Sequence, residues 1–560
     1  MKHLSISTLS ISTLKISTLS ISTLNISTLS ISTLNISTLR ISTLSISTLS
    51  ISTLSISTST LEHSDFYFIV FFSFIFRQSK ATLIAAAAGT TVGWTSPTLP
   101  ILLDPSSPIP TTPDQSSWIA SLMILSSAAS PLAAAFLAER LGRKPTLLLA
   151  AVPYILGWVL IMEANSVLLI YISRMVSGIG YGLVYTTAPM YLGEIASDKV
   201  RGSMATLITA GILSQYSIGP YVSMRTLAGL NLIVPIAFFL IFMWVPESPY
   251  YYLKSQEPEK AETSLRNLRG RTNVKAELET MEKLVNAEMK HKGKWKDLIL
   301  VEGNRRALII ILGIYTTQQL CGSTAVISYA QQIFSQTDGW MGAKEACILF
   351  GTVQLFTSGI SSLLVDRLGR RPLLLMSSAG VGLTTAVVGS YFFAKHMELN
   401  MSMIGWIPLT AIIIFICSYT IGLATVPFAI TSEMFPTNVK SLATCVIQTY
   451  TALSTFAVTK LYQVVADNLG TYVAFWGFAF FSFVGLLFIC ILLPETKGQS
   501  FAVIQDQLKM KPIQINKVIS NHPWLCCFFD ATIPRESGFH SSIIYMVLVM
   551  RTSLYLCTII

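Results

Sequence analysis

The sequence predicts an all-α membrane protein whose twelve transmembrane helices form two pseudo-symmetric halves of six. Of its 560 residues, 52% are hydrophobic and only 12% are charged, and the mean hydropathy is +0.60. Soluble domains carry about 25% charged residues. Twelve apolar segments are long enough to cross a bilayer, which takes about 20 helical residues. A charged heptapeptide, ERLGRKP at 139–145, returns as DRLGRRP at 366–372.

The apolar segments follow one another with short connections. We expect them to be helical, because unpaired backbone groups are costly in hydrocarbon. Six precede a polar insert at 247–305 and six follow it, and the insert has the charge pattern of solvated amphipathic helices. The predicted spans are 80–103, 116–138, 146–163, 167–190, 202–223, 227–246, 306–334, 346–365, 373–394, 404–431, 441–465 and 471–493.

Basic residues gather in the connections that follow the even-numbered spans. They include Arg140, Arg143, Lys144, Lys199, Arg201, Arg367, Arg370, Arg371 and Lys440, together with the cations of the insert. The connections after the odd-numbered spans offer little more than Arg225, Lys344 and Lys395. Basic loops stay on the cytoplasmic side of membranes. The insert and both termini are therefore predicted to be cytoplasmic.

The two ends of the chain differ from its middle. Residues 5–60 repeat SISTL, and a five-residue period fits neither a helix, a strand nor a common solenoid. We expect a disordered or spurious tail there, and the alternative is a β-prone tract. The apolar run at 66–76 is too short to span, and Arg551 argues against a further span at 542–560. The predicted parts are the tail 1–78, the N-terminal half 79–246, the insert 247–305, the C-terminal half 306–498 and an uncertain tail 499–560.

Composition and motifs exclude several classes of function. The eight cysteines and six histidines show no metal-ligand spacing, and no phosphate-binding glycine motif is present. We therefore predict no metal site, no cofactor and no enzymatic activity. The net charge of +10 comes from short loops and the insert, which indicates membrane topology rather than nucleic-acid binding. The lipid bilayer is the partner that the composition requires.

The two charged heptapeptides follow the second span of each half, so the halves are repeats of one plan. Gly142 and Gly369 permit a sharp turn, and Arg143 and Arg370 can reach carboxylates on neighbouring helix ends. We hypothesise that these charges pair to close the cytoplasmic side and separate when it opens, although basic residues also simply anchor that face. The predicted gate charges are Glu139, Arg140, Arg143, Arg174, Glu194, Arg201, Glu247, Asp366, Arg367, Arg370, Glu433 and Glu495.

Several motifs together resemble the sugar porters of the major facilitator superfamily. They are ERLGRK, SRMVSGIGYG, PMYLGEIASDKVRG, PESP, QQLCGSTAVISY, DRLGRR and PETKGQSF, and the match covers about 80–500. GWTSPTLP and the order of the motifs are most similar to insect facilitated trehalose transporters. The resemblance implies passive transport of a sugar, such as trehalose or glucose, across the plasma membrane by alternating access. We expect a monomer.

The resemblance also implies a sugar site between the halves, built from spans 5, 7, 8 and 10. The matching positions are Thr209, Gln318, Gln319, Thr324, Ser328, Tyr329, Gln354 and Phe428. Uncharged amides and aromatic faces suit the neutral hydroxyls of a sugar. The alternative is that Gln318 and Gln319 bond helices together. Thr209, Thr324 and Phe428 replace the Gln, Asn and Trp usual in hexose porters, and Gly322 is expected to loosen span 7.

No carboxylate lies deep in a predicted span, and Gly93-Trp94-Thr95 stands where proton-driven members carry an Asp. This favours passive transport. The alternatives are a proton-coupled sugar symporter and a non-transporting sugar sensor. Arg174 is the deep charge that the sequence presents. It is expected either to bond helix-end carbonyls or to pair with Glu194 or Glu433. The sequence does not identify the sugar or its affinity.

Overall fold

The structure is a computed structural model. It describes residues 83–195, 203–269, 273–290, 295–339, 341–399 and 404–499, residues 503, 504 and 507, and short strands between residues 4 and 56. Side chains of the strands, of 287–290, and of residues 362, 363, 366, 437 and 438 are outside this description. The chain divides into two units, Met1–Arg77 and Gln78–Ile560.

The first unit contains short parallel strands. Leu4 pairs with Leu24 and Leu24 with Leu44, so partners stand 20 residues, or four repeats, apart. The expectation that a five-residue period fits no strand is therefore wrong for these strands, because four repeats bring the Leu and Ile positions into register, while the residue between them varies, as in Ser5 opposite Asn25. The strands are β1 Leu4–Ile6, β2 Leu9–Ile11, β3 Leu14–Ile16, β4 Leu19–Ile21, β5 Leu24–Ile26, β6 Leu29–Ile36, β7 Leu39–Ile41, β8 Leu44–Ile46 and β9 Leu49–Ile56.

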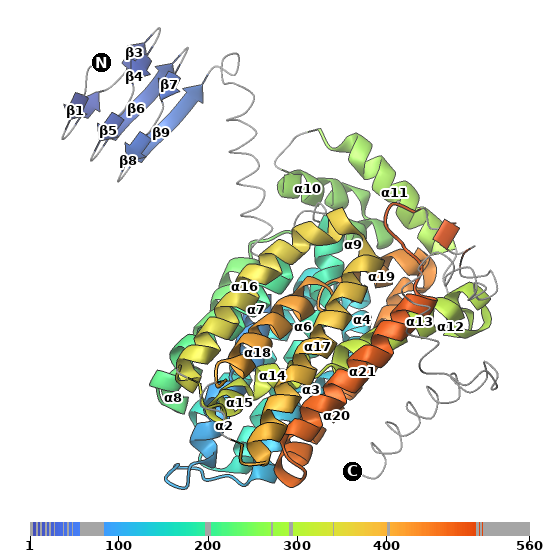
Figure 1. Cartoon of the computed structure of the whole chain (residues 1–560). Helices are drawn as coiled ribbons and strands as arrows, with labels where there is room; N and C mark the ends of the chain where they lie inside the picture. The colour runs from blue at the N-terminus through green and yellow to red at the C-terminus, as the bar shows by residue number, and fades with distance from the viewer. Residues whose placement is uncertain are drawn as a thin grey trace. The chain divides into compact units, whose positions relative to one another are not determined.

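The N-terminal half of the second unit consists of helices (Figure 1). Residues 83–93 are helical and lead through Trp94 into α2. A capping box starts α3, where Thr112 accepts the Gln115 N–H and the Gln115 side chain accepts that of Thr112. The helices are α2 Thr95–Leu103, α3 Pro113–Ser127, α4 Ser130–Arg140, α5 Arg143–Met162, α6 Val167–Ile195, α7 Ser203–Ile218, the 3-10 helix η2 Gly219–Tyr221 and α8 Met224–Phe242.

The predicted insert forms four helices, and the C-terminal half follows it. The four helices of the insert are α9 Pro249–Lys254, α10 Pro258–Arg269, α11 Lys275–Lys290 and α12 Trp295–Leu300. The C-terminal half contains α13 Glu302–Leu320, α14 Ser323–Ser328, α15 Ala330–Ser335, α16 Ala343–Leu368, α17 Arg370–His396, α18 Ile407–Ile421, α19 Val426–Met434, α20 Thr437–Asn468 and α21 Thr471–Leu492. Thus the predicted spans 7 and 10 are each interrupted.

All twelve predicted spans fall on helical segments. In the described part of the chain, nine helices or helix pairs are long and apolar enough to cross a membrane. The other three predicted spans are the helical residues 83–103, α7 with η2, and α16. Most of these segments extend beyond the predicted spans because charged and polar residues continue their ends. The all-α membrane fold of twelve helices is confirmed for the second unit.

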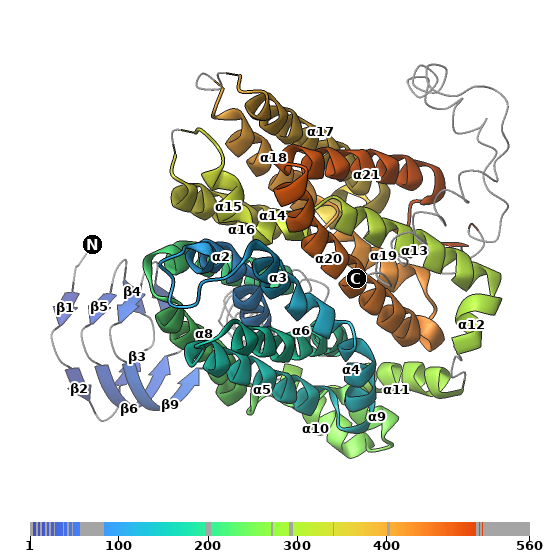
Figure 2. The ribbon, with the colours of Figure 1, turned by 90° about the horizontal axis from the view of Figure 1, so that it is seen from below.

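The two halves repeat one packing plan and share a core. In the N-terminal half α5 packs against α6 and α8, and in the C-terminal half α17 packs against α18 and α21. Figure 2 shows the blue-to-green helices of one half beside the yellow-to-red helices of the other. One buried apolar cluster draws side chains from both halves, including Trp94, Ile212, Ile327 and Phe350. The halves are therefore in contact through a common apolar core.

Candidate functional site

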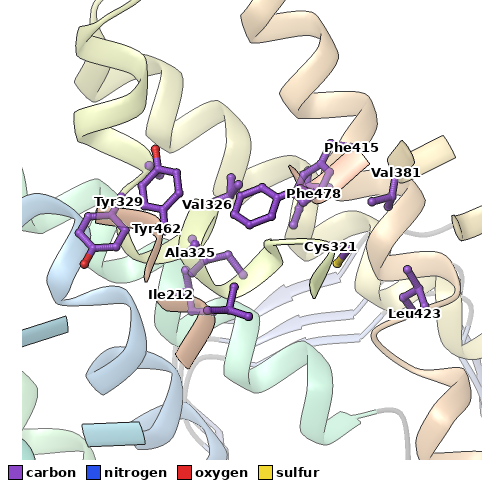
Figure 3. Close-up of a cluster of buried hydrophobic side chains, with 14 of the residues drawn as sticks. Ile212, Cys321, Ala325, Val326, Tyr329, Val381, Phe415, Leu423, Tyr462 and Phe478 are labelled. Carbon is purple, nitrogen blue, oxygen red and sulfur yellow. The ribbon is translucent and has the colours of Figure 1, made fainter. Parts of the chain in front are cut away.

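Two interrupted helices face each other in the C-terminal half. Between α13 and α14, Gly322 has a φ of 79°, and a Cβ there would collide with the ring of Phe478. Only glycine suits this left-handed and crowded position. Between α18 and α19, residues 422–425 form turns before Pro427. The predicted loosening at Gly322 is thus a real break, and Figure 3 shows Cys321, Phe478 and Leu423 in the apolar surroundings of the two breaks.

Side chains from three helices satisfy the backbone groups that the second break releases. Gln318 donates from Nε2 to the Leu423 carbonyl over 2.6 Å, and the Leu423 N–H donates to Ser377 over 3.0 Å. Ser361 donates to the Ile421 carbonyl over 3.2 Å. An interrupted transmembrane helix needs such partners, because water is absent from hydrocarbon. Gln318 therefore connects the break in one helix to the break in the other.

The glutamine pair is buried within the protein. Gln318 and Gln319 are 5% and 6% exposed, so neither faces lipid. Gln319 donates to the Gln318 side-chain oxygen over 3.1 Å and accepts from Thr455 of α20 over 2.8 Å. In this conformation the two amides bond helices together, which is the alternative that the sequence left open. Their role in binding sugar stays a prediction.

The other predicted site residues differ in whether their polar atoms have hydrogen-bond partners. Gln354 on α16 and Tyr329 after α14 are buried, and the Gln354 Oε1 and the Tyr329 hydroxyl have no partner among the described residues. Thr324, five residues before Tyr329, is half-buried, and Ser328 is buried. An unpartnered buried polar atom is rare and marks a place where a ligand or water can bond. Figure 3 shows Tyr329 beside Tyr462, with ring centroids 5.2 Å apart.

Two predicted positions stand apart from that group. Thr209 on α7 is buried but bonds the Ala205 carbonyl of its own helix over 2.9 Å. Phe428 on α19 is 39% exposed and meets Tyr315 edge to face, with centroids 6.1 Å apart. The structure brings α7 against α16 and α13 against α19, so both residues lie on helices that contact the segments carrying Gln354 and Gln318.

Several polar groups near the breaks escaped the sequence analysis. Ser323 Oγ, at the start of α14, and Thr420 Oγ1, near the end of α18, are buried without a described partner. Tyr181 and Tyr185 of α6 stack with their ring centroids 4.3 Å apart. The four-residue spacing of Tyr181 and Tyr185 on one helical face was the signal available in the sequence.

The N-terminal charged cluster consists of Arg143, Glu194 and Glu247. Arg143 donates from Nε and Nη2 to one oxygen of Glu194, over 3.0 and 2.8 Å. Glu247 accepts the backbone N–H groups of Arg143 and Lys144, each at 3.2 Å from Oε1. Gly142, with a φ of 107°, starts α5 beside Glu247. The cluster thereby joins the ends of α5, α6 and α8.

The C-terminal charged cluster consists of Arg370, Glu433 and Glu495. Arg370 donates from Nε and Nη2 to one oxygen of Glu433, over 3.0 and 2.8 Å. Glu495 accepts the backbone N–H groups of Arg370 and Arg371 over 3.0 and 3.1 Å. Gly369 precedes Arg370 with a φ of 94°. In both clusters the arginine pairs with a carboxylate of its own half.

The remaining predicted gate charges are less enclosed. Glu139 pairs with Lys254 of α9 over 3.1 Å, and both side chains are more than a third exposed. Arg140 covers the Phe136 ring at 4.6 Å, and its carbonyl accepts the Tyr251 hydroxyl. The Arg367 carbonyl accepts Lys497. Arg201 and the side chain of Asp366 lie outside the described residues.

Arg174 does not belong with the charged clusters, so its prediction as a cytoplasmic gate charge is wrong. It is 1% exposed and donates to the carbonyls of Thr91 and Ile119 over 2.9 and 3.2 Å. Its guanidinium lies 5.3 Å from the Trp94 ring centroid. Glu194 lies 20 residues further along α6, about 30 Å away at the rise of an α-helix. Arg174 therefore joins three helices of the N-terminal half through hydrogen bonds to carbonyls. The alternative prediction for this residue was that it bonds carbonyls of neighbouring helices.

At the face opposite the insert, hydrogen bonds join the two halves. The Gln331 N–H donates to Ser96 over 3.1 Å, and the Tyr216 hydroxyl donates to the Ile327 carbonyl over 2.8 Å. Lys460 of α20 donates to Asp114 at the start of α3 over 2.7 Å. Lys460 is not among the predicted site residues, although it lies inside the predicted span 441–465. These bonds show that the halves are closed together at this face.

The fold is that of major facilitator superfamily carriers. It matches the proton:xylose symporter XylE bound to 6-bromo-6-deoxy-D-glucose with a TM-score of 0.63 and 19% identity, over 78% of this chain and 99% of that one. The inward-open xylose transporter XylE from E. coli matches with a TM-score of 0.63 and 20% identity, over 77% and 99%. At these identities the likeness shows the fold alone.

Sequence comparison defines the family. The chain belongs to the sugar (and other) transporter family, whose model matches residues 52–508. The facilitated trehalose transporter Tret1 of Bombyx mori is 31% identical over 81% of this chain and 91% of its own length. A Tret1-2 homolog of Drosophila simulans is 32% identical over 81% and 95%. Tret1 of Anopheles gambiae is 32% identical over 80% of this chain, which spans 58% of that longer relative.

Proposed function

We propose that this protein is a facilitative sugar carrier that works by alternating access, with trehalose or a hexose such as glucose as substrate. The observation that carries the proposal is the pair of interrupted helices around Gly322 and residues 422–425, together with the buried polar atoms of Gln354 on α16 and Tyr329 after α14 that have no partner among the described residues. Neutral hydroxyls, each a donor and an acceptor, fit such groups. The family and its curated trehalose-transporting relatives support the same function.

We further propose that transport is passive. In the described part of the chain, the carboxylates lie at helix ends or in connections rather than in the middle of spanning helices. Proton coupling needs a titrating group that the substrate pathway can reach, and intramembrane acids usually supply it. The protein then moves sugar down its gradient in either direction without chemically changing it. We propose that it acts as a monomer in the plasma membrane, with both termini and the insert in the cytoplasm.

Uptake into proteoliposomes tests this function. Radiolabelled trehalose, glucose and fructose are compared with and without an inwardly directed proton gradient, and empty liposomes serve as the control. We expect one of these sugars to equilibrate at a rate independent of the gradient. Uphill accumulation driven by the gradient would show a proton-coupled symporter instead, and binding without uptake would show a sensor.

A comparison of three variants tests the site. The Gln354 Oε1 has no described partner, so Gln354→Leu removes little from the resting structure. If sugar bonds to it, we expect KM to rise about fivefold, the value of one hydrogen bond of about 1 kcal/mol. Thr352→Val is the control, because Thr352 lies on the same helix as Gln354 and bonds the Ile348 carbonyl of that helix. Gln318→Ala removes the bond to Leu423 and is expected to lower the transport rate rather than only raise KM. An unchanged KM in Gln354→Leu contradicts the assigned site.

A further inference from the structure

Lys460 is a buried cation in a spanning helix, at the face opposite the insert. Its side chain is 6% exposed, and it lies about two turns before the end of α20 at Asn468. Its ammonium group donates to Asp114 Oδ1 over 2.7 Å and to Ser117 Oγ over 2.6 Å, and lies 4.3 Å from the Trp118 ring centroid. All three partners belong to α3, so every one of these contacts crosses from the C-terminal to the N-terminal half.

The groups that surround the Lys460 ammonium are supplied by the other half. A buried ammonium is costly unless an opposite charge and hydrogen-bond acceptors surround it. Asp114, in contrast, is 71% exposed, so its carboxylate stays hydrated whether or not it is paired. Separation of α3 from α20 would remove all the contacts that α3 gives to Lys460. The cation therefore favours the arrangement in which this face is closed.

Neighbouring contacts at the same face depend on different chemistry. The Ser96–Gln331, Tyr216–Ile327 and Lys344–Pro220 bonds each use a backbone group of one partner. Lys460 and Asp114 are instead two side chains of opposite charge, so substitution can remove their attraction without altering any backbone group. This makes the contribution of the pair separately measurable.

We propose that Lys460 is a positioning residue for transport, because its pair with Asp114 holds the face opposite the insert closed. Neutralising either partner shifts the protein toward the state that is open at this face. The proposal rests on the alternating-access function proposed above. Its test does not require transport, so failure of one proposal can be distinguished from failure of the other.

Cys347 provides a reporter within the native chain. It lies near the start of α16, is 1% exposed, and its thiol is within hydrogen-bonding range of Ser96 of the other half. Opening of the face separates these two residues and exposes the thiol. The purified full-length protein is treated in detergent with a polar maleimide, without sugar. Peptide mass spectrometry then gives the modification rate at Cys347, with Cys417 of α18 as the internal reference and Cys347→Ser as the blank.

We expect Lys460→Gln and Asp114→Asn each to raise the modification rate at Cys347 about fivefold, the upper range for a partly exposed ion pair. Asp114 is exposed, so its variant carries the test if Lys460→Gln does not fold. Lys460→Arg keeps the charge and should keep the wild-type rate. Unchanged rates in both neutral variants would overturn the proposal.

Two controls separate this pair from a general loss of charge. Lys395 pairs with Asp338 over 2.8 Å within the C-terminal half, so Lys395→Gln should leave the Cys347 rate unchanged. The double variant Asp114→Asn with Lys460→Gln should react no faster than Lys460→Gln alone, because that variant already breaks the bond to Asp114. A double-variant rate that equals the product of the two separate increases, or an equal rise in Lys395→Gln, would contradict the proposal.

Discussion

In the N-terminal half Arg143 places two hydrogen bonds on one oxygen of Glu194, and in the C-terminal half Arg370 places the same two bonds on Glu433. The correspondence extends to the third guanidinium nitrogen. Arg143 Nη1 donates to the Ala138 carbonyl over 3.1 Å, and Arg370 Nη1 donates to the Val365 carbonyl over 3.2 Å. Each acceptor lies five residues before its arginine, across the glycine turn.

The two clusters differ in what covers them. The second oxygen of Glu194 is buried without a partner among the described residues, whereas that of Glu433 accepts the Thr496 hydroxyl over 2.6 Å. Helix α10 of the insert closes over Glu247, whose carbonyl accepts Ser264. The residues after α21, Thr496 and Lys497, cover the C-terminal cluster instead.

This difference changes the ionisation of the two equivalent carboxylates. Burial raises the pKa of Glu247 above its ordinary value, even though backbone N–H groups oppose the change. Burial also acts on Glu495, but the backbone N–H groups of Lys497, Arg370, Arg371 and Thr496 together prevail and lower its pKa. The repeated heptapeptide therefore determines the bonds of the arginine, and the segment that follows each half determines how strongly those bonds are stabilised.

The largest expected effect comes from removing the arginines. Arg143→Ala leaves Glu194 buried with neither oxygen bonded, and we expect a loss of about 3 kcal/mol of unfolding free energy. Arg370→Ala leaves Glu433 with Thr496 as a donor and is expected to cost about 2 kcal/mol. Thermal unfolding of the purified proteins in detergent measures both. If Arg370→Ala costs as much as Arg143→Ala or more, the comparison between the clusters fails.

The glycine turns give the next effect. Gly142→Ala and Gly369→Ala both force a side chain into positive φ, which costs roughly 1–3 kcal/mol. A Cβ at Gly142 would also overlap the Glu247 carboxylate, whereas at Gly369 it would lie 3.0 Å from Glu495 Oε2. We therefore expect the lower unfolding temperature for Gly142→Ala. The reverse order would show that Glu247 moves aside more easily than its burial implies.

A smaller effect tests the cover of the C-terminal cluster. Thr496→Val removes the donor to the second oxygen of Glu433 and makes this cluster resemble the N-terminal one. We expect a loss of about 1 kcal/mol, the value of one hydrogen bond. Thr496→Ser keeps the hydroxyl and serves as the control in the same unfolding measurement. Equal stability of the Val and Ser variants would exclude a role for this bond.

The smallest effect concerns acidification. The hydrogen bonds of Glu495 lower its pKa. They therefore stabilise the folded protein at pH values above 4.5, the ordinary pKa of a glutamate, and this contribution is lost as the pH falls further. Glu247 changes the stability in the opposite direction, because its pKa is raised in the folded protein. As the pH falls from neutral, Glu247 becomes protonated more readily in the folded state, and this favours folding. Unfolding temperatures between pH 7 and 3 should fall less steeply in Glu495→Gln and more steeply in Glu247→Gln than in the wild type. Parallel curves would contradict the opposite shifts.

Local patterns in the sequence predicted much of the fold and of the charged clusters. Hydropathy located all twelve spans, and the matched heptapeptides predicted the glycine turns at Gly142 and Gly369. The same patterns selected Glu194 and Glu433 as carboxylates near the arginines. These features are predictable because each depends on segment length, local charge or a required φ, and these are properties of a short stretch of chain.

The features that sequence reasoning missed depend on which helices pack together. Lys460 and Asp114 are 346 positions apart, and no local pattern indicates that α3 and α20 are neighbours. Likewise, the Leu423 carbonyl accepts Gln318 only because α18 breaks beside α13. Arg174 was misplaced for the same reason, since its partners are carbonyls of other helices and a carbonyl has no sequence signature.

The hydrogen bond from Gln318 to Leu423 couples the break after α13 to the break after α18. If α13 straightens or swings at Gly322, either the bond breaks and strands a carbonyl in an apolar interior, or α18 must bend with it. The second outcome keeps the hydrogen bond that the first one loses, so we expect the two helices to move together. A rigid-body description of the C-terminal half would overlook this internal linkage.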